Sequence, residues 1–273
     1  MSKYFTVEVL PDMGADGATT ALSTAFTDKD ILFDWHAFDI PRGGARLLSI
    51  TSIVHGTDGA DQLPGGTTLD YELIFAKDRK GVAPLTLGVN NAGVTGEGWY
   101  NHVIGRAVVD SSLQGDEGNL IRLNIVNTDL AYNAGGATYV NSPLVLQGDA
   151  LKAHGYNKDG YDRIYVAGIA LGGFDFNTGV LLNETDSATL AALGTAALDV
   201  DGTDPRNVFA VGDVIVAQDG AAVGTIKSIP SDVLINLESA HTDALTNNDE
   251  FFHQSPIRSV SYTHLRAHET DSY

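Results

Sequence analysis

Short apolar runs separated by glycine are the feature that most constrains this chain. The 273 residues include 30 glycines, and runs rich in Val, Ile, Leu, Phe and Tyr lie between them, which is typical of β-proteins. The alternation is cleanest at 69–75, LDYELIF, where Leu69, Tyr71, Leu73 and Phe75 share one face of a strand. The sequence therefore predicts an all-β fold with few or no helices.

Eight strands are predicted in the first two thirds of the chain. Their number favours a β-sandwich that is jelly-roll-like, and we place it at residues 1–183. Three segments, 83–91, 142–153 and 188–197, have a helical alternative, and the last is the best of them. The predicted strands are 5–10, 31–40, 46–54, 69–76, 120–126, 144–147, 163–171 and 174–182.

The character of the sequence changes after residue 183. Short strands are predicted at nearly regular spacing, and Asp219-Gly220 between the second and third favours a two-residue hairpin turn. We predict a small five-stranded SH3-like barrel at 184–254. Residues 255–258 indicate the start of a final sandwich strand, which would make the barrel an insertion. The predicted barrel strands are 197–200, 214–217, 222–229, 233–237 and 250–253.

The last segment, 259–273, is similar to one translated reading frame of the transposase adapter used to prepare sequencing libraries. Such scars lie outside fold reasoning, so we expect the natural chain to stop near Arg258, with the final strand truncated and the remainder unpacked. His264 and His268 have the spacing of a helical metal pair. A zinc site needs a third and a fourth ligand, and the sequence indicates neither, so we predict no metal there.

Charge and cysteine content exclude several classes of function. The chain has 16 Lys and Arg against 35 Asp and Glu, a formal net charge of −19. Such a surface repels phosphate backbones, so no nucleic-acid partner is expected. Cysteine is absent, which removes disulfides, thiolate catalysis and cysteine metal sites. The N-terminus alternates like a strand and not like a signal peptide, and no apolar run is long enough to span a bilayer, so no membrane partner is expected.

Catalytic and cofactor motifs are not evident. The sequence has no nucleophile elbow, no phosphate-binding loop and no zinc-protease helix. The acidic loops 58–61, 157–162 and 199–204 contain calcium-type ligands, but β-turns prefer the same residues. His36 and His102 have no visible partner and are interpreted as packed or surface residues. We predict no enzyme activity, no cofactor and no metal.

One loop, GEGWYNH at 96–102, carries an aromatic pair, Trp99 and Tyr100. Such a pair in a glycine-rich loop can dock a sugar ring or a partner protein. It can equally fold back over the edge of the sandwich, which is the interpretation we favour. Both readings remain open at the level of sequence.

Four stretches together resemble virion structural proteins of tailed marine bacteriophages, especially contractile-tailed phages of cyanobacteria. They are YFTVEVLP at 4–11, the segment at 31–59, IYVAGIALGGFDFNTGVLLN at 164–183, and FAVGDVIVAQDGAAVGTIKSI at 209–229. The resemblance implies a non-catalytic virion component, assembled in the host cytoplasm, whose partners are copies of itself and other virion proteins. The alternative function is a carbohydrate-binding or adhesive β-module that uses Trp99 and Tyr100.

Overall fold

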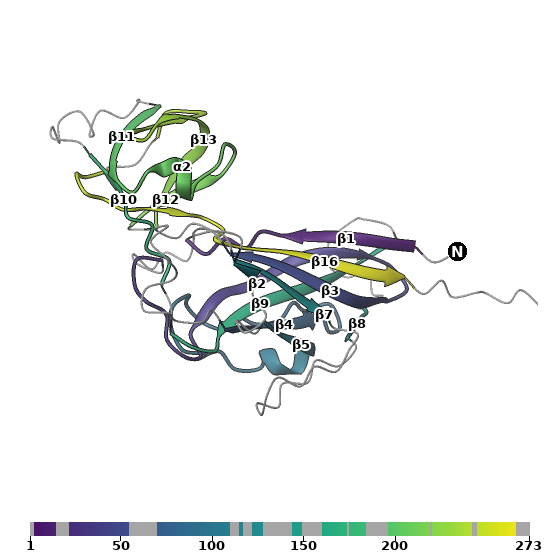
Figure 1. The fold of residues 1–273 in the computed structure, drawn as a ribbon. Helices are drawn as coiled ribbons and strands as arrows, with labels where there is room; N and C mark the ends of the chain where they lie inside the picture. The colour runs from purple at the N-terminus through teal and green to yellow at the C-terminus, as the bar shows by residue number, and fades with distance from the viewer. Residues whose placement is uncertain are drawn as a thin grey trace, which may run out of the picture.

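Figure 1 shows the fold of the protein in a computed structural model. The structure describes residues 3–14, 22–54, 70–109, 115–116, 122–127, 144–148, 160–173, 175–183, 196–218, 220–241 and 245–265. The acidic loop 58–61 lies outside these ranges, as do residues 157–159 of the acidic loop 157–162.

Two antiparallel sheets form the first module. One sheet has the order β1-β16-β3-β7-β6, with β8 also paired to β3, and the other has the order β2-β9-β4-β5. Without the short β6 and β8, the eight remaining strands follow the order of a jelly roll, in which strands adjacent in sequence mostly belong to opposite sheets. The all-β sandwich predicted from the sequence is confirmed. The bounds are β1 Lys3–Val9, β2 Ile31–Pro41, β3 Ala45–Val54, β4 Tyr71–Lys77, β5 Val103–Val109, β6 Gly115–Asp116, β7 Arg122–Asn127, β8 Leu144–Leu146, β9 Tyr161–Ala170 and β16 Ile257–Leu265.

The core of the sandwich lies between these sheets, and β4 shows how the sequence pattern produces it. Tyr71, Leu73 and Phe75 are buried between the sheets, as their alternation predicts. The hydroxyl of Tyr71 hydrogen-bonds to Ser52 of β3 in the same core. Burial raises the pKa of Tyr71 well above its ordinary range, so this hydroxyl stays protonated and the buried pair is neutral.

Strand β5 was not among the predicted strands. Its sequence, VIGRAVV, contains Gly105 and Arg106 in the middle, which breaks the apolar alternation. A Cβ on Gly105 would lie 2.3 Å from Cδ1 of Leu144, so this position needs glycine to let β8 pack against the strand. The segment at 83–91, for which a helix was an alternative, has neither helix nor strand.

The second module is a small closed barrel. Its strands have the order β10-β11-β14-β13-β12-β15, and a bridge between Leu181 and Glu250 joins the first strand to the last. Among the residues that the structure describes, the predicted five-stranded barrel therefore has six strands, because β10 belongs to it and not to the sandwich. The predicted boundary at 183/184 moves to before Val180. The bounds are β10 Val180–Leu182, β11 Ala197–Gly202, β12 Val214–Ala217, β13 Ala222–Ser231, β14 Leu234–Leu237 and β15 Phe251–His253, with the short helix α2 at Pro205–Val208.

The hairpin between β12 and β13 turns at residues 218–220. The Gly220 N–H donates to the carbonyl of Ala217, and the Ala217 N–H donates to the carbonyl of Ala221, both at 2.9 Å. The loop is therefore three residues long and not two. Gly220 has φ 83°, which matches the left-handed residue that ends three-residue hairpin loops. Asp219 lies outside the described residues.

The barrel is inserted between β9 and β16 and lies at one end of the sandwich (Figure 1). Strands β12 and β15 are buried on both faces. Ile215 and Phe251 point into the barrel core, whereas Val216 and Phe252 belong to the core of the sandwich. This two-sided burial explains why VIVA is a continuous apolar run and why the adjacent residues Phe251 and Phe252 are both apolar.

Strand β16 corrects the prediction for the end of the chain. It does not stop at Arg258 but runs to Leu265, paired with β1 on one side and β3 on the other. A ladder is made by backbone groups, so an extended segment of any compatible sequence can occupy the position between two strands. The adapter origin of 259–273 stays a prediction. His264 lies in β16, and His268 lies outside the described residues.

Candidate functional site

The aromatic loop predicted at 96–102 is held against the sandwich by its own polar atoms. Its centre is a turn of 3-10 helix, η1, at Trp99–His102. The indole N–H of Trp99 donates to the carbonyl of Gly96 at 2.9 Å. Nδ1 of the buried His102 lies 3.0 Å from the carbonyl oxygen of Lys77, so the ring donates to that carbonyl and anchors the loop to the end of β4.

The two aromatic residues of this loop have different environments. Trp99 packs on the outer face of the second sheet, with Ile74 and Leu87, and its ring centroid lies 6.3 Å from that of Trp35. Tyr100 is 63% exposed and meets Trp99 edge-on at 6.3 Å. Trp99 therefore covers the sheet, and Tyr100 is the member of the pair that solvent or a partner can reach.

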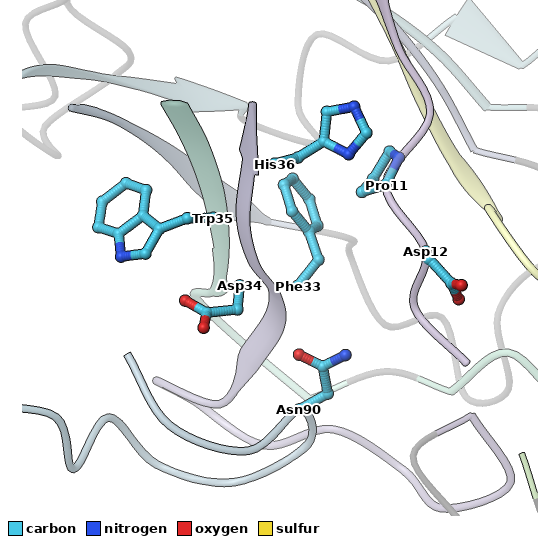
Figure 2. Close-up of a pocket in the computed structure, with 7 residues that line it drawn as sticks. All are labelled: Pro11, Asp12, Phe33, Asp34, Trp35, His36 and Asn90. Carbon is cyan, nitrogen blue, oxygen red and sulfur yellow. The ribbon is translucent and has the colours of Figure 1, made fainter. Parts of the chain in front are cut away.

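A pocket that sequence reasoning did not find lies along β2 (Figure 2). Its volume is about 230 Å³. Three of the lining residues are apolar and four are polar, and they come from the segment after β1, from β2 and from the loop before η1. The lining residues are Pro11, Asp12, Phe33, Asp34, Trp35, His36 and Asn90. His36 had drawn attention in the sequence, but nothing there connected it to residues 12 and 90.

Irregular pairing of β2 with β9 shapes this pocket. Two register shifts occur, one between Ile31 and Phe33 and one between Phe33 and His36. Each places an extra residue on β2, as a β-bulge does, and bulges re-aim side chains. A Cβ on Gly168 of β9 would lie 2.4 Å from the ring of Phe33, so glycine is what allows this ring to lie against the sheet.

The carboxylates of the pocket are oriented by hydrogen bonds. Oδ1 of Asp34 accepts from the N–H of Leu87 at 3.0 Å. Oδ1 of Asp12 accepts from the N–H of Gly14 at 3.0 Å, and its Oδ2 accepts from Nε2 of Gln254 at 2.5 Å. Burial lowers the pKa of His36 below its ordinary value, which favours the neutral ring at pH 7.

Other ionisable groups of the barrel complete structural contacts. Oε1 of Glu250 accepts from the N–H groups of Thr178 at 2.7 Å and Gly179 at 3.0 Å. The buried His253 accepts from the N–H of Ser255 at Nδ1, 2.9 Å away, and its Nε2 lies 3.3 Å from Asp213. The backbone therefore holds Nδ1 of His253, and Nε2 faces the Asp213 carboxylate.

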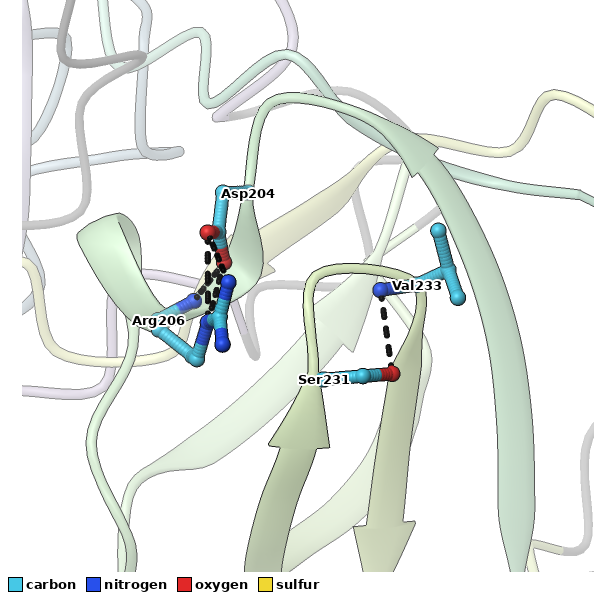
Figure 3. A network of polar contacts seen from close by, with 4 residues as sticks. All are labelled: Asp204, Arg206, Ser231 and Val233. Atoms are coloured by element: carbon cyan, nitrogen blue, oxygen red, sulfur yellow. Dashed lines mark hydrogen bonds and ion pairs between the residues drawn. The ribbon is translucent and has the colours of Figure 1, made fainter.

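The acidic loop at 199–204 is used for a helix cap. Asp204 accepts from the N–H of Arg206 at 3.0 Å, which caps α2, and it binds the Arg206 guanidinium through both oxygens (Figure 3). These bonds lower the pKa of Asp204. Asp162, from the edge of another acidic loop, pairs with Arg42 at 3.3 Å. Over the described ranges, no group of three or more His, Asp or Glu side chains could hold a metal ion.

Comparisons with known proteins give little that bears on this chain. No family model matches it, and no curated protein matches it. Among solved structures, it is similar to one described as "Structure of infectious bursal disease virus Gx strain", at 10% identity and a TM-score of 0.13, with 97% of this chain and 41% of that chain covered. The chain thus spans less than half the length of that protein, and the likeness is too weak to bear on fold or function. Among the residues that the structure describes, no helix is long and apolar enough to cross a membrane.

Proposed function

We propose that this chain is a non-catalytic structural or decoration protein of the virion of a tailed marine bacteriophage, and that it contributes to head or tail assembly through protein-protein contacts. The resemblance of its sequence stretches to such proteins supports this proposal. Its partners are copies of itself and other virion proteins, and it is assembled in the host cytoplasm.

The observation that carries the proposal is the way the barrel packs against the sandwich. Val216 and Phe252 place barrel residues in the core of the sandwich, and the N–H of Met13 donates to the carbonyl of Gln254 at 2.9 Å. The barrel is therefore a fixed projection and not a tethered module. A projection of fixed orientation suits a subunit that repeats in a symmetric lattice, because every copy presents the same surface in the same geometry.

Jelly-roll sandwiches occur in viral capsids and also in lectins, so the fold agrees with both functions considered for the sequence and does not choose between them. Three ionisable residues, Glu250, His253 and Asp204, each take part in a contact that supports the fold. This agrees with a protein that acts through the contacts of its surface. The exposed Tyr100 is one residue of that surface.

Co-purification with virions tests the proposal. The full natural gene is first recovered from a longer environmental contig. Antibodies against its product are then used to detect the protein in phage particles purified from the same water sample. We expect the protein in purified particles at a fixed copy number, and the isolated protein to form a homo-oligomer in multi-angle light scattering. A protein that stays monomeric at micromolar concentration and is absent from particles would contradict the proposal.

A further inference from the structure

The loop between β4 and β5 presents an apolar surface to solvent. Leu85 is 56% exposed and Tyr100 is 63% exposed. Leu85 lies beside the turn that carries Tyr100, since a Cβ on Gly98 would be 3.3 Å from its Cδ1. The carbonyl of Leu85 accepts from the indole N–H of Trp35 at 2.8 Å, so the loop is held in place. We call Leu85, Trp99 and Tyr100 the loop patch.

A basic turn adjoins the loop patch. The turn at 79–82 is closed by backbone hydrogen bonds in both directions between its first and last residues, and it carries Arg79 and Lys80, both exposed. It begins just after Lys77, whose carbonyl oxygen is bound to η1, and it leads directly to Leu85. Both ends of the turn are thus tied to the loop patch.

The exposed charge around the loop patch is mainly positive. Arg79 and Lys80 are exposed, Asp78 beside them is buried, and Glu97 is the acidic side chain that this loop exposes. This local excess of positive charge stands on a chain whose formal net charge is −19. An apolar and aromatic centre with charged groups at its rim is typical of protein interfaces, and its charge calls for an acidic partner.

The barrel has the opposite charge. Residues 180–254 contain 12 Asp and Glu, against Arg206 and Lys227 as basic residues. At the turn between β13 and β14, Val233 is 50% exposed, and the adjacent Asp232 is exposed as well. This turn therefore offers an apolar side chain next to a carboxylate.

A second carboxylate lies beside the same turn. Asp199 of β11 is exposed, and β11 pairs with β14 next to this turn. Arg206 is also close, but Asp204 binds it through both oxygens (Figure 3), so that pair adds no net charge. We call Asp199, Asp232 and Val233 the barrel tip. Its composition complements that of the loop patch.

We propose that the loop patch of one copy of this chain binds the barrel tip of another copy. Val233 packs against Leu85 and Tyr100, and the carboxylates of the tip face Arg79 and Lys80. The inference rests on the proposed function, because it names the surface through which copies of a virion protein associate.

This contact joins two copies and not two parts of one chain. Figure 1 shows the barrel beyond one end of the sandwich and well apart from β5, which η1 directly precedes. The barrel is fixed in that position by Val216 and Phe252, which belong to the sandwich core. A contact between different surfaces of identical chains is head-to-tail, so its repetition gives a ring or a filament.

Two variants and their mixture test the head-to-tail contact in the full chain. Tyr100→Glu places a carboxylate in the loop patch, and Asp232→Lys places a cation on the barrel tip. Sedimentation velocity should show each variant as a monomer at concentrations at which the parent chain associates. The equimolar mixture should form a dimer of one copy of each variant, because one intact loop patch and one intact barrel tip remain.

Val145→Glu is the matched control. Val145 is 58% exposed on β8, outside both surfaces, so this variant should associate as the parent does. Thermal midpoints close to that of the parent show that all three variants are folded. Raising the ionic strength should weaken association of the parent, because salt screens the exposed charges of both surfaces.

Four results would overturn the inference. They are a parent chain that stays monomeric, association of both variants as strong as that of the parent, a mixture of folded variants that stays monomeric, and association of Asp232→Lys alone when Tyr100→Glu is monomeric. The last result would mean that the loop patch binds itself across a twofold axis. Detection of the protein in purified particles is a separate measurement, so the virion proposal can hold when this inference fails.

Discussion

Val216 of the barrel lies directly against Gly14 of the segment that follows β1. A Cβ on Gly14 would lie 3.1 Å and 3.2 Å from the two methyl groups of Val216, so a side chain at this position would have to displace Val216 by a few tenths of an ångström. Because Val216 is also part of the sandwich core, the inserted barrel and its host share one continuous apolar region, and we expect them to fold as one unit.

Gly14→Val should loosen this junction. The added methyl groups overpack the contact with Val216, which costs about 1–3 kcal/mol. If the modules are coupled, hydrogen exchange will rise in β4 of the sandwich and in β13 of the barrel together. Gly93→Val is the matched control, because nothing lies within 4 Å of a Cβ on Gly93. Faster exchange confined to the barrel would contradict the coupling.

Removal of residues 259–273 should destabilise the protein strongly. The deletion takes away most of β16, which leaves β1 without its neighbour and exposes the edge of β3. We expect a fall in the thermal midpoint well beyond the 2–4 °C that corresponds to about 1 kcal/mol for a chain of this size. A chain that ends at Leu265 is the control and should behave as the full chain does. Equal midpoints for chains ending at Arg258 and Leu265 would show that the strand contributes nothing.

Gly220→Val should destabilise the barrel by about 1 kcal/mol or more, because Gly220 has φ 83° and a β-branched residue resists positive φ. Gly220→Asn is the matched variant, since asparagine tolerates the left-handed region, and it should cost less. Urea denaturation followed by far-UV circular dichroism measures both. Equal stability of the Val and Asn variants would mean that the turn does not depend on this residue.

Glu250 should make the protein less stable as the pH rises above the ordinary pKa of a glutamate. Burial raises the pKa of Glu250, although hydrogen bonds from Gly179 and Thr178 act in the opposite direction. The folded state therefore binds this proton more tightly than the unfolded state does. The resulting stabilisation is complete below the unfolded pKa, about 4.3, and is lost as the pH rises through the folded pKa.

Glu250→Gln tests this pH dependence. The amide keeps an oxygen that can accept from the N–H groups of Thr178 and Gly179, and it does not titrate. Urea denaturation measures the stability of both proteins between pH 4 and pH 7. In the upper part of this range, the parent protein should lose stability relative to the variant as the pH rises, because only the parent carries Glu250. Parallel stability curves for the two proteins would rule out a raised pKa at Glu250.

Local pattern was sufficient for much of the fold. Alternation placed Tyr71, Leu73 and Phe75 on the core face of β4, and the runs at 214–217 and 250–253 were predicted as strands. Such predictions succeed because burial on one face of a strand depends on residues two positions apart, which the sequence displays directly. The Asp-Gly pair likewise marked a turn, although the length of the loop depended on how β12 and β13 pair.

Long-range pairing decided the rest. The strand that contains Gly105 was missed because its glycine is explained only by Leu144, a residue far away in sequence. Strand β10 was assigned to the sandwich because closure of the barrel rests on the bridge between Leu181 and Glu250. The pocket had no sequence signature, since His36, Asp12 and Asn90 meet only after β2 bulges and the modules dock. Sequence alone determined most of the strands, because strand formation depends largely on nearby side chains. Tertiary structure decided which strands pair and which side chains share a pocket, because those depend on contacts between residues that the sequence keeps far apart.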